Sequence, residues 1–318
     1  MALRILFFGT PSFAVPSLVA LAASGHEIAG VITQPDRPRG RGHRVTAEAV
    51  KLAAVERGLP VLQPLRLNTP EALESIAALD ADLGVVAAYG KILPAALLAM
   101  PRLGCINVHA SLLPRWRGAA PVHRAILAGD TMTGVTIMRV VQALDAGPAL
   151  DRVETNIDPD ENSLHLEQRL ATLGAELLAA VVGRLARGPV PETTQDEAGV
   201  TYAHRLTRED SPVRWDRPAD EVHNHIRGLH PWPLASSTLN GRRLLLLRAA
   251  MSVGSDAPVE PGTVVHVDRA GVDIATRPGA IRLLELQEEG RAAMAIGAYL
   301  NGRPIHVGDR FTSPPASI

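Results

Sequence analysis

The most informative part of this sequence is GCINVHASLLPRWRGAAP, residues 104–121, which we call the deciding stretch. It begins as a short apolar run that is typical of a buried strand and that ends at His109. Polar side chains stand two residues apart at Asn107, His109 and Ser111, and a loop with prolines and arginines follows. Because successive side chains of a strand point to opposite faces, Asn107 and His109 share one face. The stretch therefore predicts a buried strand that carries an amide and an imidazole at its carboxyl end.

Outward from this stretch, the first half of the chain alternates strands with helices. Strands that are apolar throughout and separated by helices indicate a parallel sheet covered on both faces. We expect strands at 3–8, 28–33, 82–88, 104–109, 133–141 and 149–156. A long leucine-spaced helix, expected over residues 163–187, closes this part. The predicted fold class is α/β, with a Rossmann-like, mostly parallel sheet in the N-terminal domain.

The second half of the chain predicts a smaller domain of another kind. Residues 187–210 are polar, contain two prolines and lack periodicity, which is typical of an interdomain linker. After a helix at 218–229, short β segments recur about every ten residues with glycine turns, as in small barrels. We expect an N-terminal domain at 1–188, a linker at 189–207 and an OB-like β-barrel at 208–318.

Composition limits the class and the compartment of the protein. The net charge of the 318 residues is −1, so the overall charge does not call for a polyanionic partner. The one cysteine, Cys105, excludes an intrachain disulfide and a cysteine-built zinc site, and it suits a reducing cytoplasm. No window approaches 18 continuous apolar residues, and the N-terminus is typical of a first strand, so we expect a cytoplasmic protein without a membrane partner.

The polar residues around the deciding strand suggest a site for proton transfer. Ligands of parallel α/β sheets bind beyond the carboxyl ends of the strands, where Asn107 and His109 stand. An Asn amide can donate a hydrogen bond to a developing oxyanion, and a His can move a proton near neutral pH. Asp145, on a turn-like loop with Gly147 and Pro148, can supply the carboxylate that orients such an imidazole. These observations make Asn107, His109 and Asp145 the candidate catalytic residues.

Other interpretations of these residues stay open at this point. His109 and Ser111 could form a nucleophilic pair, although they point the same way and the chain has no G-x-S-x-G elbow there. A metal site on His109 would need further ligands at suitable spacing, and none follows from the sequence, so we expect no metal. Asn107 and His109 could also be hydrogen-bonded structural residues. A dinucleotide-binding oxidoreductase is disfavoured because GTPSF, residues 9–13, does not match G-x-G-x-x-G.

The stretch CINVHASLLPRWRGAAP closely resembles the signature of the 10-formyltetrahydrofolate-dependent formyltransferases. The resemblance extends over nearly the whole chain, through FFGTPSFAVPSL, VITQPDRPRGRG, AAYGKILP, GVTIMRVVQALDAGP, TYAHRLTRED and GLHPWPLA. It implies transfer of a formyl group from N10 of the folate co-substrate to the α-amine of methionine on initiator tRNA, without a metal. An amino-sugar nucleotide as acceptor is the alternative, and we expect the protein to be a monomer.

The resemblance also implies roles for individual residues. It implies that Asn107, His109 and Asp145 are catalytic. The folate-binding residues that it implies are Tyr89, Gly90, Ile92, Ser111, Leu112, Leu113 and Pro114. The tRNA-binding residues that it implies are Arg37, Arg39, Arg41 and Arg44, within the insertion 35–44.

This chain departs from the family pattern at a few positions. Ala110 and Ala143 stand where the family often has glycine, and His43 and Arg44 replace lysines at the end of the basic insertion. These changes leave the charge of the insertion positive. Arg115 and Arg117 receive no role from the sequence: the folate tail, tRNA phosphates and the loop itself are all open as partners.

Overall fold

The structure, a computed structural model, describes residues 1–39, 44–252 and 259–313, without the side chains of residues 37–39, 44 and 45. Contacts divide the chain into two compact units. The first unit contains residues 1–121, 132–156 and 167–203, and the second contains residues 122–131, 157–166 and 204–318. The chain thus passes between the units more than once.

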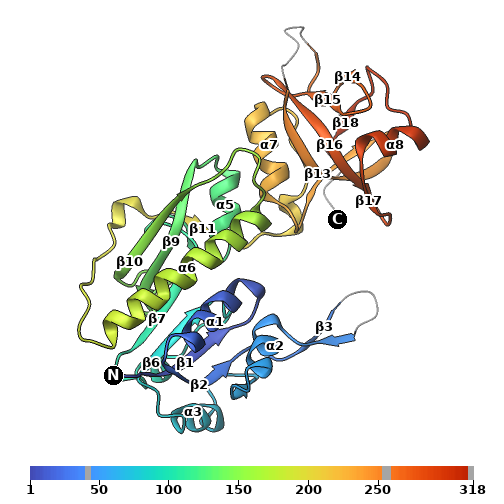
Figure 1. Cartoon of the computed structure of the whole chain (residues 1–318). Helices are drawn as coiled ribbons and strands as arrows, with labels where there is room; N and C mark the ends of the chain where they lie inside the picture. The colour runs from blue at the N-terminus through green and yellow to red at the C-terminus, as the bar shows by residue number, and fades with distance from the viewer. Residues whose placement is uncertain (40–43, 253–258, 314–318) are drawn as a thin grey trace. The chain divides into compact units, whose positions relative to one another are not determined.

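The first unit is built on a mostly parallel sheet, as the sequence predicts (Figure 1). In spatial order its strands are β10 (Ala149–Asn156), β9 (Met132–Arg139), β7 (Cys105–His109), β6 (Leu83–Ala87), β1 (Arg4–Gly9), β2 (Glu27–Ile32) and β5 (Val61–Leu62). The pairs from β7 to β5 are parallel, whereas β9 runs antiparallel to β7 and β10 antiparallel to β9. The deciding stretch therefore begins in an interior strand, with β6 on one side and β9 on the other.

Helices cover the sheet of the first unit. They are α1 (Val15–Ala23), α2 (Ala49–Glu56), α3 (Pro70–Ala77), α4 (Ala95–Leu98) and the long α6 (Ser163–Leu185), with 3-10 turns at Ser12–Ala14 and Glu197–Gly199. The helix expected over 163–187 is confirmed as α6, which runs along β7, β9 and β10 (Figure 1). Gly174 of α6 lies so close to the sheet that an added Cβ would stand 2.9 Å from Val108 Cγ1. The absence of a side chain at Gly174 therefore lets α6 pack directly on β7.

Several short pairings were not predicted from the sequence, and the pairing of β5 with β2 is one of them. The hairpin of β3 (Arg37–Arg39) and β4 (Arg44–Thr46) pairs antiparallel within the basic insertion. The short β8 (Arg117–Gly118) pairs in parallel with β11 (Tyr202–Ala203). Thr193 also forms an antiparallel bridge with Ala149 of β10. Much of the segment expected as a linker thus runs along the first unit, because its backbone is hydrogen-bonded there.

The second unit contains an antiparallel, curled sheet, in agreement with the predicted small barrel. Its strands are β12 (Ala235–Leu239), β13 (Arg242–Ser252), β14 (Val264–Val267), β15 (Val272–Ala275), β16 (Ala280–Glu288), β17 (Ala293–Ala295) and β18 (Phe311–Thr312). The order is β14-β15-β16-β13-β12-β18, and an antiparallel bridge between Thr263 and Arg310 joins the two ends. The sheet therefore curls back on itself around a core that includes Trp215 and Phe311.

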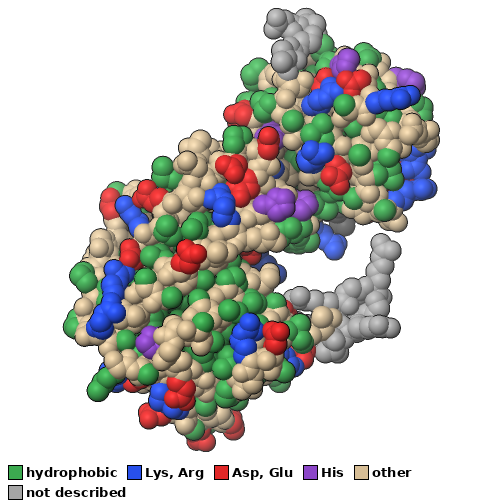
Figure 2. Space-filling model, viewed as in Figure 1, with side chains coloured by type: hydrophobic (Ala, Val, Ile, Leu, Met, Phe, Trp, Pro, Cys, Tyr) green, Lys and Arg blue, Asp and Glu red, His purple; other side chains and the backbone are tan. Residues whose placement is uncertain are grey.

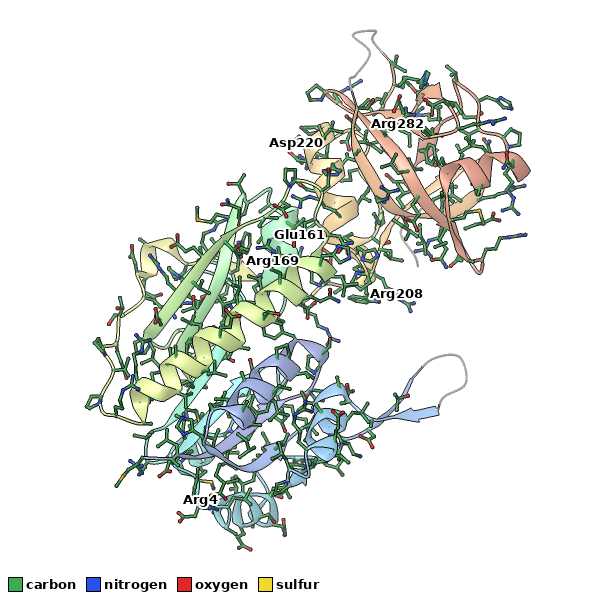
Figure 3. All side chains as sticks on the ribbon, in the orientation of Figure 1. Arg4, Glu161, Arg169, Arg208, Asp220 and Arg282 are labelled. Carbon is green, nitrogen blue, oxygen red and sulfur yellow. The ribbon has the colours of Figure 1, made fainter. Side chains whose placement is uncertain are left out.

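Helices and an ion-pair cluster complete the second unit. The helices are α5 (Pro121–Leu127), α7 (Ala219–Gly228) and α8 (Ile296–Gly302), with a 3-10 turn at Arg208–Asp210. On β16, Arg282 (labelled in Figure 3) donates to both carboxylate oxygens of Asp273 at 3.0 and 2.9 Å and also contacts Asp268. The Arg282 guanidinium holds the pKa of Asp268 well below its usual range. This pairing fixes the turn between β14 and β15 against β16.

The visible surface mixes both signs of charge. Figure 2 shows Lys and Arg side chains interspersed with Asp and Glu over the face that it displays, which agrees with the net charge of −1. Within the described residues, no helix has the length and apolar character needed to span a membrane.

Candidate active site

The strand β7 places Asn107 and His109 on the face opposite to α6. Val108 between them points toward α6, where it lies against Gly174, and side chains of a strand alternate between faces. Asn107 is half-buried, and no hydrogen bond of its side-chain amide is found among the described residues. An amide held on a rigid strand and without a protein partner can donate to a ligand.

His109 is fixed by two neighbours. The side chain is almost completely buried, with 5% exposed. Its Nε2 lies 2.9 Å from the carbonyl oxygen of Trp116, and its Nδ1 lies 3.8 Å from Oδ2 of Asp145. Because a carbonyl oxygen can only accept, Nε2 carries a proton and Nδ1 is the nitrogen that faces the carboxylate. The imidazole is therefore oriented for proton exchange on its Nδ1 side.

Asp145 approaches His109 from the loop between β9 and β10. Its Oδ2 accepts a hydrogen bond from the backbone N–H of Gly118 at 2.8 Å. Its φ of 46° lies in the left-handed region, which is uncommon for a residue with a side chain. Two residues later, a Cβ on Gly147 would stand 2.0 Å from the carbonyl oxygen of Arg139, so this turn requires glycine. The structure thus brings Asp145 to His109, and both lie at the strand that carries Asn107.

Ser111 does not form a pair with His109. It is fully buried, and its hydroxyl donates to the carbonyl oxygen of Arg115 at 2.6 Å. Thr136 of β9 joins the loop to the sheet, because its hydroxyl donates to Ser111 O at 2.7 Å and accepts from Leu113 N at 3.2 Å. A serine held in this way is a structural anchor and not an activated nucleophile.

The other expected folate residues lie in contrasting environments. Leu113 is buried, Leu112 and Pro114 are partly exposed, and the Leu113–Pro114 peptide bond is cis. The Tyr89 ring is buried in a core cluster and packs edge-on against Phe8, with ring centroids 5.7 Å apart.

Burial decreases from Tyr89 to Ile92, the two ends of this segment. Burial raises the pKa of Tyr89 to about 12. Gly90 adopts a φ of 78°, and its missing side chain leaves room for the Gln34 amide, which donates to Tyr89 O at 2.8 Å. Ile92 is 88% exposed. Within this segment the Tyr89 ring is thus part of the core, whereas Ile92 is open to solvent.

The expected tRNA residues lie on the hairpin of β3 and β4. Arg37 and Arg39 belong to β3 and Arg44 to β4, and Arg41 lies outside the described residues. At the root of this hairpin, Asp36 accepts hydrogen bonds from Lys51 Nζ at 2.5 Å and Gln63 Nε2 at 2.8 Å. The hairpin is thus anchored near the β5 edge of the sheet, whereas the loop of Asp145 lies at the β10 edge.

Sequence reasoning left the role of Arg117 open and did not single out Gln195. Arg117 has only 4% of its surface exposed, and its Nε donates to Gln195 Oε1 at 3.0 Å. Gln195 in turn contacts the Asp145 loop. The arginine was visible in the deciding stretch, but an arginine in a loop is usually exposed, and nothing in the sequence pointed to a partner about eighty residues away.

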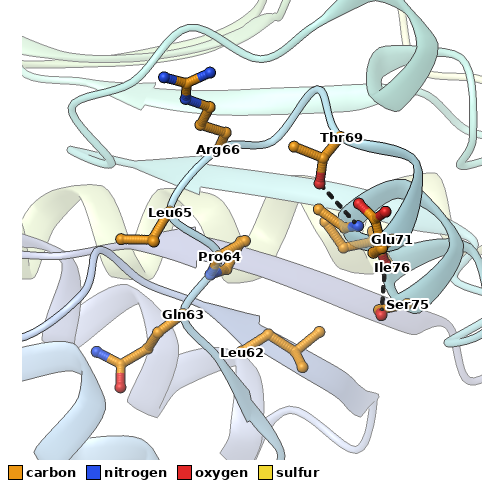
Figure 4. A pocket seen from close by; sticks show the side chains of 10 residues that line it. Leu62, Gln63, Pro64, Leu65, Arg66, Thr69, Glu71, Ser75 and Ile76 are labelled. Atoms are coloured by element: carbon orange, nitrogen blue, oxygen red, sulfur yellow. Dashed lines mark hydrogen bonds between the residues drawn. The ribbon is translucent and has the colours of Figure 1, made fainter.

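A separate pocket lies at the β5 edge of the first unit (Figure 4). It has a volume of about 540 Å³ and is lined by the end of β5, the following loop and α3. Thr69, one of the lining residues, caps α3 because its hydroxyl accepts a hydrogen bond from Ala72 N at 3.3 Å. No predicted site residue lines this pocket. Three strands, β6, β1 and β2, separate its strand from β7.

No metal-ligand cluster accompanies the site in the part of the chain that the structure describes. Groups of three or more His, Cys, Asp or Glu side chains that could hold an ion do not occur there. Burial raises the pKa of Cys105, at the start of β7, to about 12, so this thiol stays protonated at neutral pH. His109 stands at the other, carboxyl end of β7, where it and Asp145 can exchange a proton.

Comparison with known proteins identifies the family of this chain. The family model described as formyl transferase matches residues 3–182, and the model of the formyl transferase C-terminal domain matches residues 205–304. The chain is 50% identical over 304 residues to the methionyl-tRNA formyltransferase of Xanthomonas euvesicatoria, covering 95% of this chain and 98% of the relative. It is 46% identical to the methionyl-tRNA formyltransferase of Methylococcus capsulatus with the same coverage.

Solved structures share the fold at low identity. The N-formyltransferase of Helicobacter canadensis, in complex with folinic acid and dTDP-3-aminofucose, superposes with a TM-score of 0.68 at 16% identity, covering 90% of this chain and 99% of that chain. HypX from Aquifex aeolicus, in complex with tetrahydrofolic acid, gives a TM-score of 0.66 at 18% identity, covering 98% and 51%. The two family models together match most of the sequence, and the chain belongs to the formyl transferase family.

Proposed function

We propose that this protein transfers the formyl group of 10-formyltetrahydrofolate to the α-amine of methionine on initiator tRNA, for translation initiation. The observation that carries the proposal is the near full-length similarity to relatives named methionyl-tRNA formyltransferase. The positions of Asn107, His109 and Asp145 support it, because they combine an amide without a partner among the described residues and an oriented imidazole–carboxylate pair. These groups suit acyl transfer through a tetrahedral intermediate.

The proposed mechanism begins with the amine. An α-amino group titrates near 8, so it must lose a proton before its nitrogen attacks the formyl carbon. The attack forms a C–N bond and a tetrahedral oxyanion, to which Asn107 donates a hydrogen bond. His109 and Asp145 manage the proton that passes from the amine to the departing N10, and Asp145 stabilises the positive charge that develops on the imidazole. The C–N10 bond then breaks and tetrahydrofolate leaves.

The folate binds, in this proposal, along the walls beside the strand ends. Ser111, Leu112, Leu113 and Pro114 form one wall, which the bonds of Thr136 hold against β9. The backbone of Tyr89 and Gly90 and the exposed Ile92 form the second. A flat apolar slot with a few backbone groups suits a pteridine ring.

The tRNA contacts are assigned to the hairpin of β3 and β4. Arg37, Arg39, Arg41 and Arg44 give this insertion a positive charge that suits RNA phosphates. We further propose a cytoplasmic monomer with a catalytic domain at 1–188, a linker at 189–207 and a tRNA-binding domain at 208–318.

The proposal is tested by formyl incorporation with several acceptors in parallel. The protein is incubated with 10-formyltetrahydrofolate and either charged initiator tRNA, charged elongator tRNA or an amino-sugar nucleotide. We expect formyl incorporation into initiator Met-tRNA at a kcat/KM at least about 100-fold above either alternative. Preferred formylation of the amino sugar would contradict the proposed acceptor.

A further inference from the structure

Three consecutive residues, Trp116, Arg117 and Gly118, contact both members of the imidazole–carboxylate pair. The carbonyl oxygen of Trp116 accepts from His109 Nε2 at 2.9 Å. The N–H of Gly118 donates to Asp145 Oδ2 at 2.8 Å. We call residues 116–118 the bracket. Because these contacts are made by the backbone, the position of the bracket sets the positions of His109 and Asp145 relative to each other.

The bracket is joined to the segment 195–203 by backbone and side-chain bonds. Arg117 N donates to Thr201 O at 2.9 Å, and Trp116 N donates to Thr201 Oγ1 at 2.9 Å. The buried Arg117 side chain donates through Nε to Gln195 Oε1 at 3.0 Å and through Nη2 to Glu197 Oε1 at 2.8 Å. A buried guanidinium is costly unless it is hydrogen-bonded and paired, so these contacts explain why Arg117 is tolerated there.

Gln195 continues this chain of contacts to the Asp145 loop. Its Nε2 donates to the carbonyl oxygens of Asp145 at 2.8 Å and Gly147 at 2.7 Å. A guanidinium can only donate and a carbonyl oxygen can only accept, so the contacts fix which end of the Gln195 amide faces each partner. Gln195 is 8% exposed, so water does not readily replace its bonds.

The Asp145 loop needs such support because its backbone is constrained. The left-handed conformation of Asp145 is uncommon for a residue with a side chain and persists only where surrounding contacts impose it. Gly147 is pressed against the carbonyl oxygen of Arg139, so the turn has little room to adjust. The two hydrogen bonds from Gln195 span this turn on both sides of Ala146.

We infer that Gln195 and Arg117 are positioning residues for Asp145: Arg117 orients the Gln195 amide, and the amide holds the Asp145 backbone where its carboxylate meets His109. This inference rests on the proposed function, since it assigns the role within the same reaction. It also gives Arg117 a role within the protein, in place of a contact with the folate tail or with tRNA phosphates. The segment 195–203 thus acts on the reaction through Asp145.

The matched variants are Gln195→Glu and Gln195→Met. Gln195→Glu keeps an oxygen for Arg117 but replaces the donating Nε2 with an oxygen that repels the two carbonyls. Gln195→Met keeps the length and removes the donor without adding charge. We expect kcat to fall about 10- to 100-fold in both, because displacement of a catalytic group by about 1 Å has this effect. The KM values for folate and for tRNA should stay within about threefold.

The control variant is Glu197→Gln on the same segment. The Glu197 side chain is 75% exposed and contacts Arg117 but not the Asp145 loop. This substitution should change kcat by less than about twofold, because a glutamine at position 197 keeps an oxygen that can accept the hydrogen bond from Arg117 Nη2. A fall in kcat equal to that of Gln195→Met would contradict the inference, since it would trace the effect to the segment as a whole.

The decisive comparison is a double-mutant cycle with Asp145→Asn. If Gln195 acts through Asp145, Gln195→Met lowers kcat in the wild type but by less than about threefold in Asp145→Asn. The pH dependence of kcat should also change in Gln195→Met relative to the wild type. The inference would be overturned if the losses in kcat of the two single variants multiply in the double variant and the pH profile of Gln195→Met equals that of the wild type. Gln195 would then have a general structural role.

The outcomes separate this inference from the proposed function. If the wild-type protein fails to formylate initiator Met-tRNA, the proposed function is wrong. If the wild type is active, Asp145→Asn is at least about 100-fold slower and both Gln195 variants are as active as the wild type, only the inference is wrong. Thermal unfolding of each variant verifies that the compared proteins are folded.

Discussion

Two loops of the first unit are held in different ways. The Asp145 loop is fixed by the nearly fully buried Gln195, which bonds its backbone, and by the partly buried N–H of Gly118, which bonds the Asp145 carboxylate. The hairpin of β3 and β4 is anchored at its root by Asp36 and Lys51, whose side chains are 24% and 26% exposed. The Lys51 ammonium, followed by the Gln63 amide, holds the pKa of Asp36 below its usual value.

The difference matches what each loop is proposed to do. A proton-transfer group must be held to within a fraction of an ångström, which requires dry, directional hydrogen bonds. A loop that contacts phosphates needs positive charge near them, and it tolerates more variation in the positions of its side chains. We therefore expect changes at the Asp145 loop to act on kcat, and changes at the hairpin root to act on KM for tRNA.

The largest effect is expected at Asn107, on the strand β7 that also carries His109. Asn107→Asp keeps the size of the side chain but replaces the donor with a negative charge that faces the oxyanion. Loss of one such donor costs about 10²–10³ in kcat, and the added charge places Asn107→Asp at the upper end. Single-turnover formylation and folate affinity, measured on the same preparation, check this. A kcat near that of the wild type would contradict the oxyanion role.

A smaller effect is expected at the hairpin root. Lys51→Met removes the ion pair with Asp36, and we expect KM for Met-tRNA to rise about 3- to 10-fold while kcat stays near the wild-type value. Steady-state kinetics with varied tRNA measures this. Asp36→Asn is the matched control, because it keeps the Lys51 charge and weakens the same contact. If only Lys51→Met raises KM, Lys51 contacts RNA directly and the anchoring explanation is wrong.

The smallest effect is expected on the free energy of unfolding, and it tests the burial of the Tyr89 hydroxyl. The Tyr89 hydroxyl has no hydrogen-bond partner among the described residues, so Tyr89→Phe should stabilise the fold by about 1 kcal/mol at pH 7. Desolvation raises the pKa of Tyr89 to about 12 in the folded protein. The neutral form is therefore favoured by folding, and stability is lost as pH rises from the unfolded value near 10 toward 12.

The measurement is urea unfolding of both proteins between pH 7 and pH 11.5. The wild type should lose stability over the alkaline range faster than Tyr89→Phe, which lacks the titrating group. Parallel pH profiles of the two proteins would show that the Tyr89 hydroxyl is solvated in the folded state.

The sheet could be predicted from the sequence because its strands are continuous apolar runs. The same periodicity placed Asn107 and His109 on one face of β7, and the glycine turn near Asp145 indicated a loop that can approach closely. The support of that loop could not be predicted. Gln195 stands in a polar segment without periodicity, and its contact with Arg117 depends on tertiary packing between residues far apart in the chain.

The second unit shows the same limit in another form. The leucine-rich β13 and the β16 strand follow from their apolar spacing. The two-residue β18 has no apolar pattern of its own, and it is defined by its pairing with β12. Elements of this size are set by tertiary contacts.

The most direct test of the account is the single-turnover rate of formyl transfer to initiator Met-tRNA in Asp145→Asn, with saturating 10-formyltetrahydrofolate. The substitution keeps the shape of the side chain and removes the charge that faces His109 Nδ1 at 3.8 Å. We predict a rate at least about 100-fold below the wild type with folate affinity unchanged, because positioned acid–base groups contribute about 10²–10⁴. A rate within threefold of the wild type would contradict the assignment of the His109–Asp145 pair to proton transfer.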